Sequence, residues 1–131
     1  MRVLVIDDDE VELRAVTGLL QKRGFDVVTA LSSEQAYALL DATRIDGALV
    51  DLMMPRMNGI ELIRGLKQRA PWLRVVLTSS FPLAHGQLAR LGLDDVRFVS
   101  KPANTDVLVA AFEPPPPPRD RSTGGTPLTP R

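Results

Sequence analysis

Short apolar runs alternate with segments of helical periodicity along most of this chain. The runs cover residues 3–6, 26–30, 47–50, 74–78 and 96–99, and each has the length of a β-strand. After each run, apolar residues recur every three or four positions, as in an amphipathic helix. Such an alternation predicts an α/β fold in which a parallel sheet is covered by helices on both faces, with right-handed crossovers.

Capping and breaking residues mark the ends of several predicted helices. Gly24 ends the first helix, and Ser32-Ser33-Glu34-Gln35 is typical of a capping box at the start of the second. Asn104 can cap the last helix, which Pro114 stops within about two turns. The fourth helical segment, around residues 83–91, has the weakest pattern. We expect a flavodoxin-like, doubly wound (βα)5 domain with strand order 2-1-3-4-5.

Charged residues stand where three of the apolar runs end. Asp7, Asp8 and Asp9 follow the first run, Asp51 follows the third, and Lys101 follows the fifth. In the order 2-1-3-4-5 the first and third strands are neighbours, so Asp7, Asp8 and Asp51 should meet at the carboxyl edge of the sheet. Carboxylates gathered there repel one another unless a cation neutralises them. The pattern predicts a bound cation, with Lys101 nearby and one carboxylate left free to react.

Composition narrows the classes of function. The chain has 131 residues, enough for one domain, and its 16 basic and 16 acidic residues give no net charge to favour nucleic acid or an anionic membrane. It has no cysteine, which excludes disulfides and thiol chemistry. The sequence shows no membrane segment. We therefore expect no direct nucleic-acid or membrane partner, and a cytoplasmic location fits the cysteine-free composition.

The composition changes sharply after residue 113. Seven of the 11 prolines lie between residues 114 and 131, five of them consecutive. Such a segment favours polyproline II structure and disorder over a packed core. We expect a folded domain over residues 1–113 and a proline-rich, disordered tail over residues 114–131.

Four segments together carry a family resemblance. In order and at predicted strand ends, they resemble the receiver domain of bacterial two-component response regulators over residues 1 to about 112. The segments are Val5-Ile6-Asp7-Asp8-Asp9, residues 49–59 (LVDLMMPRMNG), Val76-Leu77-Thr78-Ser79 and Ser100-Lys101-Pro102.

The resemblance implies that Asp51 accepts a phosphoryl group from a phosphohistidine or a small acyl phosphate. The residues favour the same choice, because the apolar segment after Asp51 offers no competing carboxylate. The resemblance also implies that Asp7 and Asp8, directly or through water, hold Mg²⁺ together with Asp51 and the main-chain carbonyl of Met53. Lys101 can pair with the phosphate as a point charge, and the Thr78 hydroxyl can donate to a phosphoryl oxygen.

By the same resemblance, Phe98 occupies an aromatic switch position that responds to Thr78, although plain core packing also explains it. Phosphorylation would then alter the surface formed by the fourth helix, the strand over 96–99 and the last helix. We expect a signalling domain and not an enzyme, apart from autophosphorylation with small donors and autodephosphorylation. Its expected partners are a histidine kinase or phosphotransfer protein and a downstream protein, and the domain is expected to be monomeric or to dimerise on phosphorylation. The tail either ends a stand-alone receiver or links it to an output domain.

Two other functions remain open on the sequence. Ile6-Asp7-Asp8-Asp9-Glu10-Val11 also fits a haloacid-dehalogenase-type phosphatase, with Asp7 as nucleophile and Asp9 as acid and base. The second alternative is a receiver-like scaffold that works without phosphorylation. Asp9 and Glu10 are better explained as acidic residues that favour the start of a helix than as metal ligands.

Overall fold

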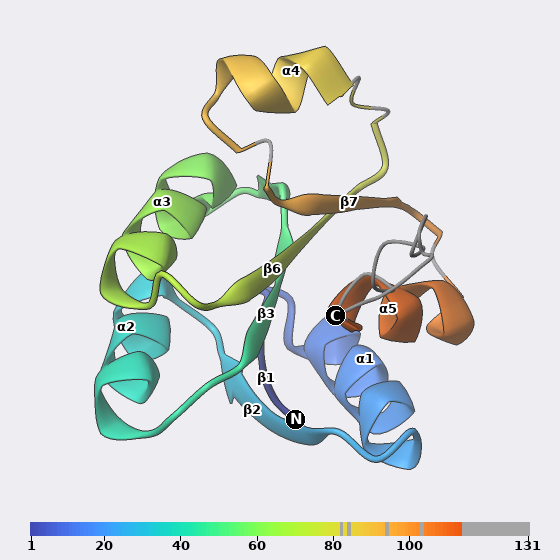
Figure 1. The fold of residues 1–131 in the computed structure, drawn as a ribbon. Helices are drawn as coiled ribbons and strands as arrows, with labels where there is room; N and C mark the ends of the chain where they lie inside the picture. Colours follow the sequence, from blue (N-terminus) through green and yellow to red (C-terminus); the bar gives the residue numbers. More distant parts are fainter. Residues whose placement is uncertain (82, 84, 94, 103, 114–131) are drawn as a thin grey trace, which may run out of the picture.

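The computed structural model describes residues 1–113 except positions 82, 84, 94 and 103. The expected tail over 114–131 lies outside the described residues. Strands and helices alternate as the sequence predicts (Figure 1). In chain order they are β1 (Arg2–Ile6), α1 (Glu10–Lys22), β2 (Asp26–Ala30), α2 (Ser33–Ala42), β3 (Gly47–Asp51), β4 (Met53–Met54), β5 (Met57–Asn58), α3 (Gly59–Arg69), β6 (Arg74–Ser79), α4 (His85–Arg90), β7 (Arg97–Ser100) and α5 (Thr105–Phe112).

The main sheet confirms the predicted topology. Its strand order is β2-β1-β3-β6-β7, which is 2-1-3-4-5 when these five strands are counted along the chain. Every adjacent pair is parallel, and Ile6 near the end of β1 lies opposite Val50 near the end of β3. The residues that follow β1 and those that end β3 therefore emerge side by side at one edge.

A small hairpin interrupts the loop that the sequence predicts after the third strand. Met53–Met54 and Met57–Asn58 pair as the antiparallel strands β4 and β5. Asn58 also caps α3, because its side-chain oxygen accepts the N–H groups of Ile60 and Glu61. Strands of two residues are too short to show an alternating pattern, so no pattern in the sequence predicts this hairpin.

Helices cover both faces of the sheet (Figure 1). Consecutive side chains of β1 point to opposite faces, so Val3 and Val5 pack with α1 and α5, whereas Leu4 and Ile6 pack with α2 and α3. Leu88 of α4 joins the core on the second face. No helix in the described part of the chain is long and apolar enough to cross a membrane.

The C-terminal end of α5 is held at two points. Phe112 is completely buried, with its ring 5.9 Å from the ring of Phe25. Gly47 of β3 leaves space for this ring, since a Cβ there would lie 2.9 Å from its nearest carbon. Arg97 Nη1 also donates to three carbonyls at the helix end, which need partners outside the helix. They belong to Ala110, Ala111 and Glu113, at 3.3, 3.0 and 2.8 Å.

Replacing Phe112 tests how far α5 depends on this anchor. We expect Phe112→Ala to lower the free energy of unfolding by about 3–5 kcal/mol, because it leaves a cavity between β3 and α5. Urea unfolding followed by circular dichroism measures the change. Phe81→Ala is the matched control, since the Phe81 side chain is 60% exposed. Equal effects of the two substitutions would contradict the anchoring role of Phe112.

Candidate functional site

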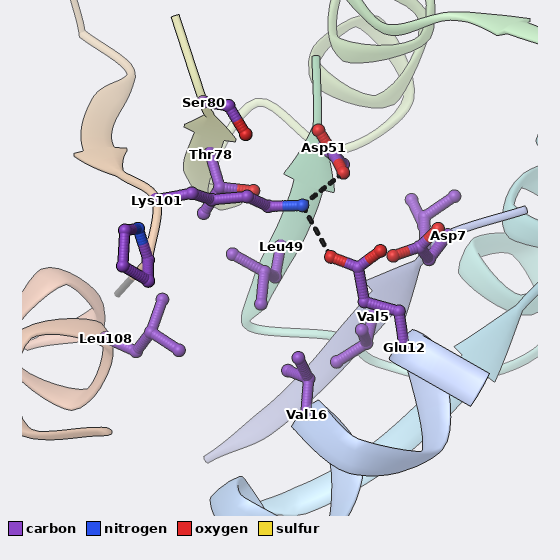
Figure 2. Close-up of a pocket in the computed structure, with 12 residues that line it drawn as sticks. Val5, Asp7, Glu12, Val16, Leu49, Asp51, Thr78, Ser80, Lys101 and Leu108 are labelled. Carbon is purple, nitrogen blue, oxygen red and sulfur yellow. Dashed lines mark hydrogen bonds and ion pairs between the residues drawn. The ribbon is translucent and has the colours of Figure 1, made fainter. Parts of the chain in front are cut away.

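Four predicted site residues meet at the carboxyl edge of the sheet. Asp7 follows β1, Asp51 is the last residue of β3, and Lys101 follows β7. Thr78 of β6 lies opposite Asp51 in the strand register. Figure 2 shows Asp51, Thr78 and Lys101 around one space, with Asp7 at its side. The parallel strand order is what brings these distant positions in the sequence together.

Asp51 is held through both of its carboxylate oxygens. Its Oδ2 lies 2.5 Å from Lys101 Nζ, and its Oδ1 accepts the Met53 N–H at 2.9 Å. The side chain of Asp51 is 10% exposed and that of Lys101 is 25% exposed. A carboxylate fixed in this way keeps one orientation while it remains reachable from solvent.

Glu12 of α1 is a further member of the site that the sequence analysis missed. Its Oε1 lies 2.6 Å from Lys101 Nζ, so the ammonium is shared between Glu12 and Asp51 (Figure 2). Oxygens of Asp7, Glu12 and Asp51 all lie within 4.8 Å of one another. A polar residue in a helix normally indicates a solvent-facing position. The available signal was its place in the first turn of the helix that begins just after Asp7.

Asp8 and Met53 are placed differently from the converging carboxylates. Asp8 is not one of the three residues whose oxygens meet, and its Oδ2 accepts the Arg56 N–H at 3.1 Å. It therefore ties the end of β1 to the β4–β5 hairpin. Met53 is 54% exposed, and its predicted role involves only its main-chain carbonyl.

Asp9 caps a helix. Its carboxylate accepts the N–H groups of Val11 and Glu12 at 3.0 and 3.4 Å, at the start of α1. This confirms the interpretation of Asp9 as a residue that favours a helix start. A carboxylate engaged in this way is also poorly placed to act as the acid and base of a phosphatase.

Burial raises the pKa of Asp7 above its ordinary value of 3.8. The Asp9 N–H, which donates to Asp7 Oδ1 at 2.9 Å, opposes this rise. The carboxylates of Glu12 and Asp51 raise the pKa further, and Lys101 lowers it. Ionised Asp7 is thus less favourable in the folded protein than in the unfolded chain.

Two opposing effects act on the pKa of Lys101. Burial alone would lower its pKa, but the hydrogen bonds to Asp51 and Glu12 outweigh burial and raise the pKa above 10.5. Lys101 therefore carries its positive charge at neutral pH, where the carboxylates need it.

The residues present fit a divalent cation. Three carboxylates converge on a region that Lys101 neutralises only in part, and carboxylate oxygens are the ligands that Mg²⁺ and Ca²⁺ prefer. Asp7 and Asp51 belong both to the set predicted from the sequence and to the set that converges here. The structure thus supports an acidic cation site and extends it to Glu12.

Thr78 and Phe98 lie on opposite faces of the β6–β7 pair. Thr78 is 5% exposed, and its Oγ1 lies 3.5 Å from the Val50 carbonyl. Phe98 is partly buried, packs against the core on the α2 and α3 face, and lines a groove between α4 and α5. Its packing is compatible with either a switch or a core role.

A cavity of about 540 Å³ opens beside Asp51 (Figure 2). Its rim is polar and includes Asp7, Glu12, Asp51, Thr78, Ser80 and Lys101. Its floor is apolar and comes from β1, β3, α1 and α5 through Val5, Leu49, Val16 and Leu108.

Comparisons with known proteins agree on one family. The family described as "Response regulator receiver domain" matches residues 3–113. The transcriptional regulatory protein CpxR of Escherichia coli is 37% identical over 110 residues, which are 83% of this chain and 46% of CpxR. The alginate biosynthesis transcriptional regulatory protein AlgB of Pseudomonas aeruginosa is 31% identical over 107 residues, 82% of this chain and 24% of AlgB. The chain thus spans a quarter to a half of these relatives.

A solved structure is also similar. It is a response regulator protein from Burkholderia pseudomallei with a phosphorylated aspartic acid, a calcium ion and citrate. The TM-score is 0.76 at 27% identity, over 86% of this chain and 66% of that one.

Asp7→Asn tests the cost of the buried carboxylate. In metal-free buffer at neutral pH we expect the variant to unfold at a higher urea concentration than the wild type. The raised pKa means that wild-type stability falls as pH rises from below 3.8 through that pKa, and an amide removes this fall. Added Mg²⁺ should stabilise the wild type more than the variant.

Asp41→Asn, at an exposed position of α2, is the control and should behave like the wild type. A metal-free Asp7→Asn variant that unfolds at a lower urea concentration than the wild type would contradict the account of Asp7.

Proposed function

The chain belongs to the family of response regulator receiver domains, and we propose that Asp51 is the aspartate that takes up the phosphoryl group. Receiver domains of two-component systems are switches controlled by phosphorylation of an aspartate. The observation that carries the assignment is the position of the Lys101 ammonium, which lies against Asp51 at the end of β3. Asp51 is the one aspartate in that strand. Thr78 stands beside Asp51 in the register and supplies a hydroxyl.

In the proposed reaction a carboxylate oxygen of Asp51 forms a bond to phosphorus. The bond from phosphorus to a histidine nitrogen, or to an acyl oxygen, breaks, and its electron pair stays on the leaving group. The Met53 N–H keeps the carboxylate oriented throughout. Lys101 already lies against Asp51 Oδ2, so its ammonium can pair with the negatively charged phosphoryl oxygens once they are bound to Asp51. The Thr78 hydroxyl can donate a hydrogen bond to one of these oxygens.

We assign the Mg²⁺ ligands to Asp51, the Met53 carbonyl, and Asp7 and Asp8, these two directly or through water; Asp8 accepts the Arg56 N–H through Oδ2 only. The convergence of Asp7 and Asp51 supports this assignment. When bound, the cation neutralises negative charge on the carboxylates and the phosphoryl oxygens. Glu12 adds a third carboxylate to the same region.

The proposed output is a change in the surface formed by α4, β7 and α5. Thr78 lies opposite Val99 in the register, and Val99 follows Phe98, so we expect a shift of the Thr78 hydroxyl toward phosphate to act on the neighbouring strand β7. Phe98 lies in the groove between α4 and α5, where a new ring position would reshape that surface.

The assignment of partners rests on the family. We propose that a histidine kinase or phosphotransfer protein supplies the phosphoryl group, that a downstream protein binds the altered surface, and that the domain acts as a phosphoacceptor and not as an enzyme. The family match over residues 3–113 supports a domain boundary near residue 113. The monomeric state, the absence of direct nucleic-acid binding and the cytoplasmic location stay predictions from the sequence.

Family membership favours the receiver over the phosphatase alternative, which needs Asp7 as nucleophile and Asp9 as acid and base. Asp9 is engaged as a helix cap and Asp7 accepts the Asp9 N–H, whereas Asp51 lies against the ammonium. A scaffold that works without phosphorylation is the second candidate, and labelling distinguishes it.

Asp51→Asn should abolish labelling. With Mg²⁺ and acetyl phosphate, we expect the wild type to gain one phosphoryl group that hydroxylamine removes, and the variant to gain none, because an amide is not a nucleophile toward phosphorus. Intact-mass spectrometry and mapping of the labelled peptide measure this. Asp41→Asn should label like the wild type. Label on Asp7 would support the phosphatase, and an unlabelled wild type would support the scaffold.

Thr78→Ala should separate phosphorylation from its effect. We expect Asp51 to accept the phosphoryl group, and the phosphorylation-dependent changes in amide chemical shift along β7 and α4 to shrink several-fold, since a coupling of about 1–3 kcal/mol passes through this hydroxyl. Two-dimensional NMR with and without phosphodonor measures both. Thr29→Ala, at an exposed position of β2, is the control. Full-size shifts in phosphorylated Thr78→Ala would refute the proposed switch.

A further inference from the structure

The apolar floor of the cavity beside Asp51 has no part in phosphoryl transfer. The reaction proposed above uses groups of the rim, namely Asp51, Thr78 and Lys101. A phosphoryl group carries oxygens on every side and has no apolar surface to place against valine and leucine. The volume of about 540 Å³ lies within the roughly 300–1,000 Å³ that is usual for small-molecule sites. The site thus contains room and surface for a second kind of ligand.

The floor is built by elements from both sides of the space. Figure 2 shows Val5 and Leu49 of the sheet behind it, Val16 of α1 below and Leu108 of α5 at the side. Val16 is partly exposed, whereas Val5, Leu49 and Leu108 are buried, so an apolar group placed there would cover Val16 and displace the water that the cavity admits, which is favourable.

The charge of the rim selects the head group of such a ligand. Three carboxylates line the cavity and one ammonium faces them, so with all of them ionised the lining carries two excess negative charges. Lys101 Nζ is within 2.6 Å of both Glu12 and Asp51 and is already shared. An anionic head group would meet unmatched carboxylates, whereas a cationic head group would neutralise them.

We propose that this cavity binds a small primary amine with an apolar body, whose ammonium lies against Glu12 and Asp7 and whose body lies on the floor formed by Val5, Val16, Leu49 and Leu108. The ammonium and a divalent cation draw on the same carboxylates, so the amine and Mg²⁺ compete. The inference that the amine regulates phosphorylation rests on the proposed function. The inference that the cavity binds the amine does not.

Benzylamine is the probe, and benzyl alcohol of nearly the same shape is its neutral counterpart. Each is titrated into the full chain in buffer with chelator and without phosphodonor, and methyl groups are followed by NMR. We expect benzylamine to shift the methyl signals of the four floor residues and to bind about tenfold more tightly than benzyl alcohol, as a charge-assisted hydrogen bond predicts. Shifts elsewhere, or equal affinity for the alcohol, would overturn the proposal.

Two variants separate the head group from the floor. Glu12→Gln should weaken benzylamine about tenfold and leave benzyl alcohol unchanged, which a general structural disturbance would not do. Val16→Phe should weaken both compounds because it fills the floor. Leu19→Phe, also on α1 but 41% exposed, is the matched control and should weaken neither. If Val16→Phe fails to fold, Glu12→Gln still decides, and unchanged amine affinity in that variant would refute the assignment.

Competition completes the test. Millimolar Mg²⁺ should raise the apparent dissociation constant of benzylamine, and benzylamine should slow labelling by acetyl phosphate at limiting Mg²⁺. Binding that Mg²⁺ does not affect would contradict the shared carboxylates. Because the binding measurements contain no phosphodonor, they stand even if Asp51 takes up no phosphoryl group, so failure of one proposal is distinguishable from failure of the other.

Discussion

The ammonium of Lys101 is the interaction on which the site depends. The topology places β1 beside β3, and this forces the carboxylates of Asp7 and Asp51 toward each other, while α1 brings Glu12 to the same place. Like charges at such distances oppose folding unless a positive charge is shared among them. Lys101, at the end of a strand two places away from β3 in the sheet, supplies that charge to two of the three acids. The remaining negative charge is what makes the site attract cations.

The sequence predicted those parts of the site that depend only on where strands end. A charge directly after an apolar run must lie at the edge of a parallel sheet, so the positions of Asp7, Asp51 and Lys101 followed from the pattern alone. Glu12 did not follow, because a helix residue gains its neighbours from how the helix packs, and nothing in the spacing of α1 states which polar residue turns toward the sheet. The partner of Asp8 depends on a hairpin whose strands have two residues each, and so small an element leaves no period to detect.

The proposed coupling between the site and the α4–β7–α5 surface has a simple geometric basis. β7 is an edge strand that pairs only with β6 in the described sheet, so fewer hydrogen bonds hold it than hold the central strands. Thr78 and Phe98 point to opposite faces of this pair, one toward the site and the other toward α4. An edge strand that carries Phe98 and pairs with the strand of Thr78 is well suited to transmit a displacement, because moving it disturbs one ladder of hydrogen bonds and not two.

Arg97 connects β7 to a further element, the helix α5. Its guanidinium binds the last carbonyls of α5, so the end of that helix is fastened to β7 and not only to the core beneath it. A rotation of β7 would therefore move the last turn of α5 with it. Through Arg97, a small displacement at the edge of the sheet would thus reach the end of a helix on one of its faces.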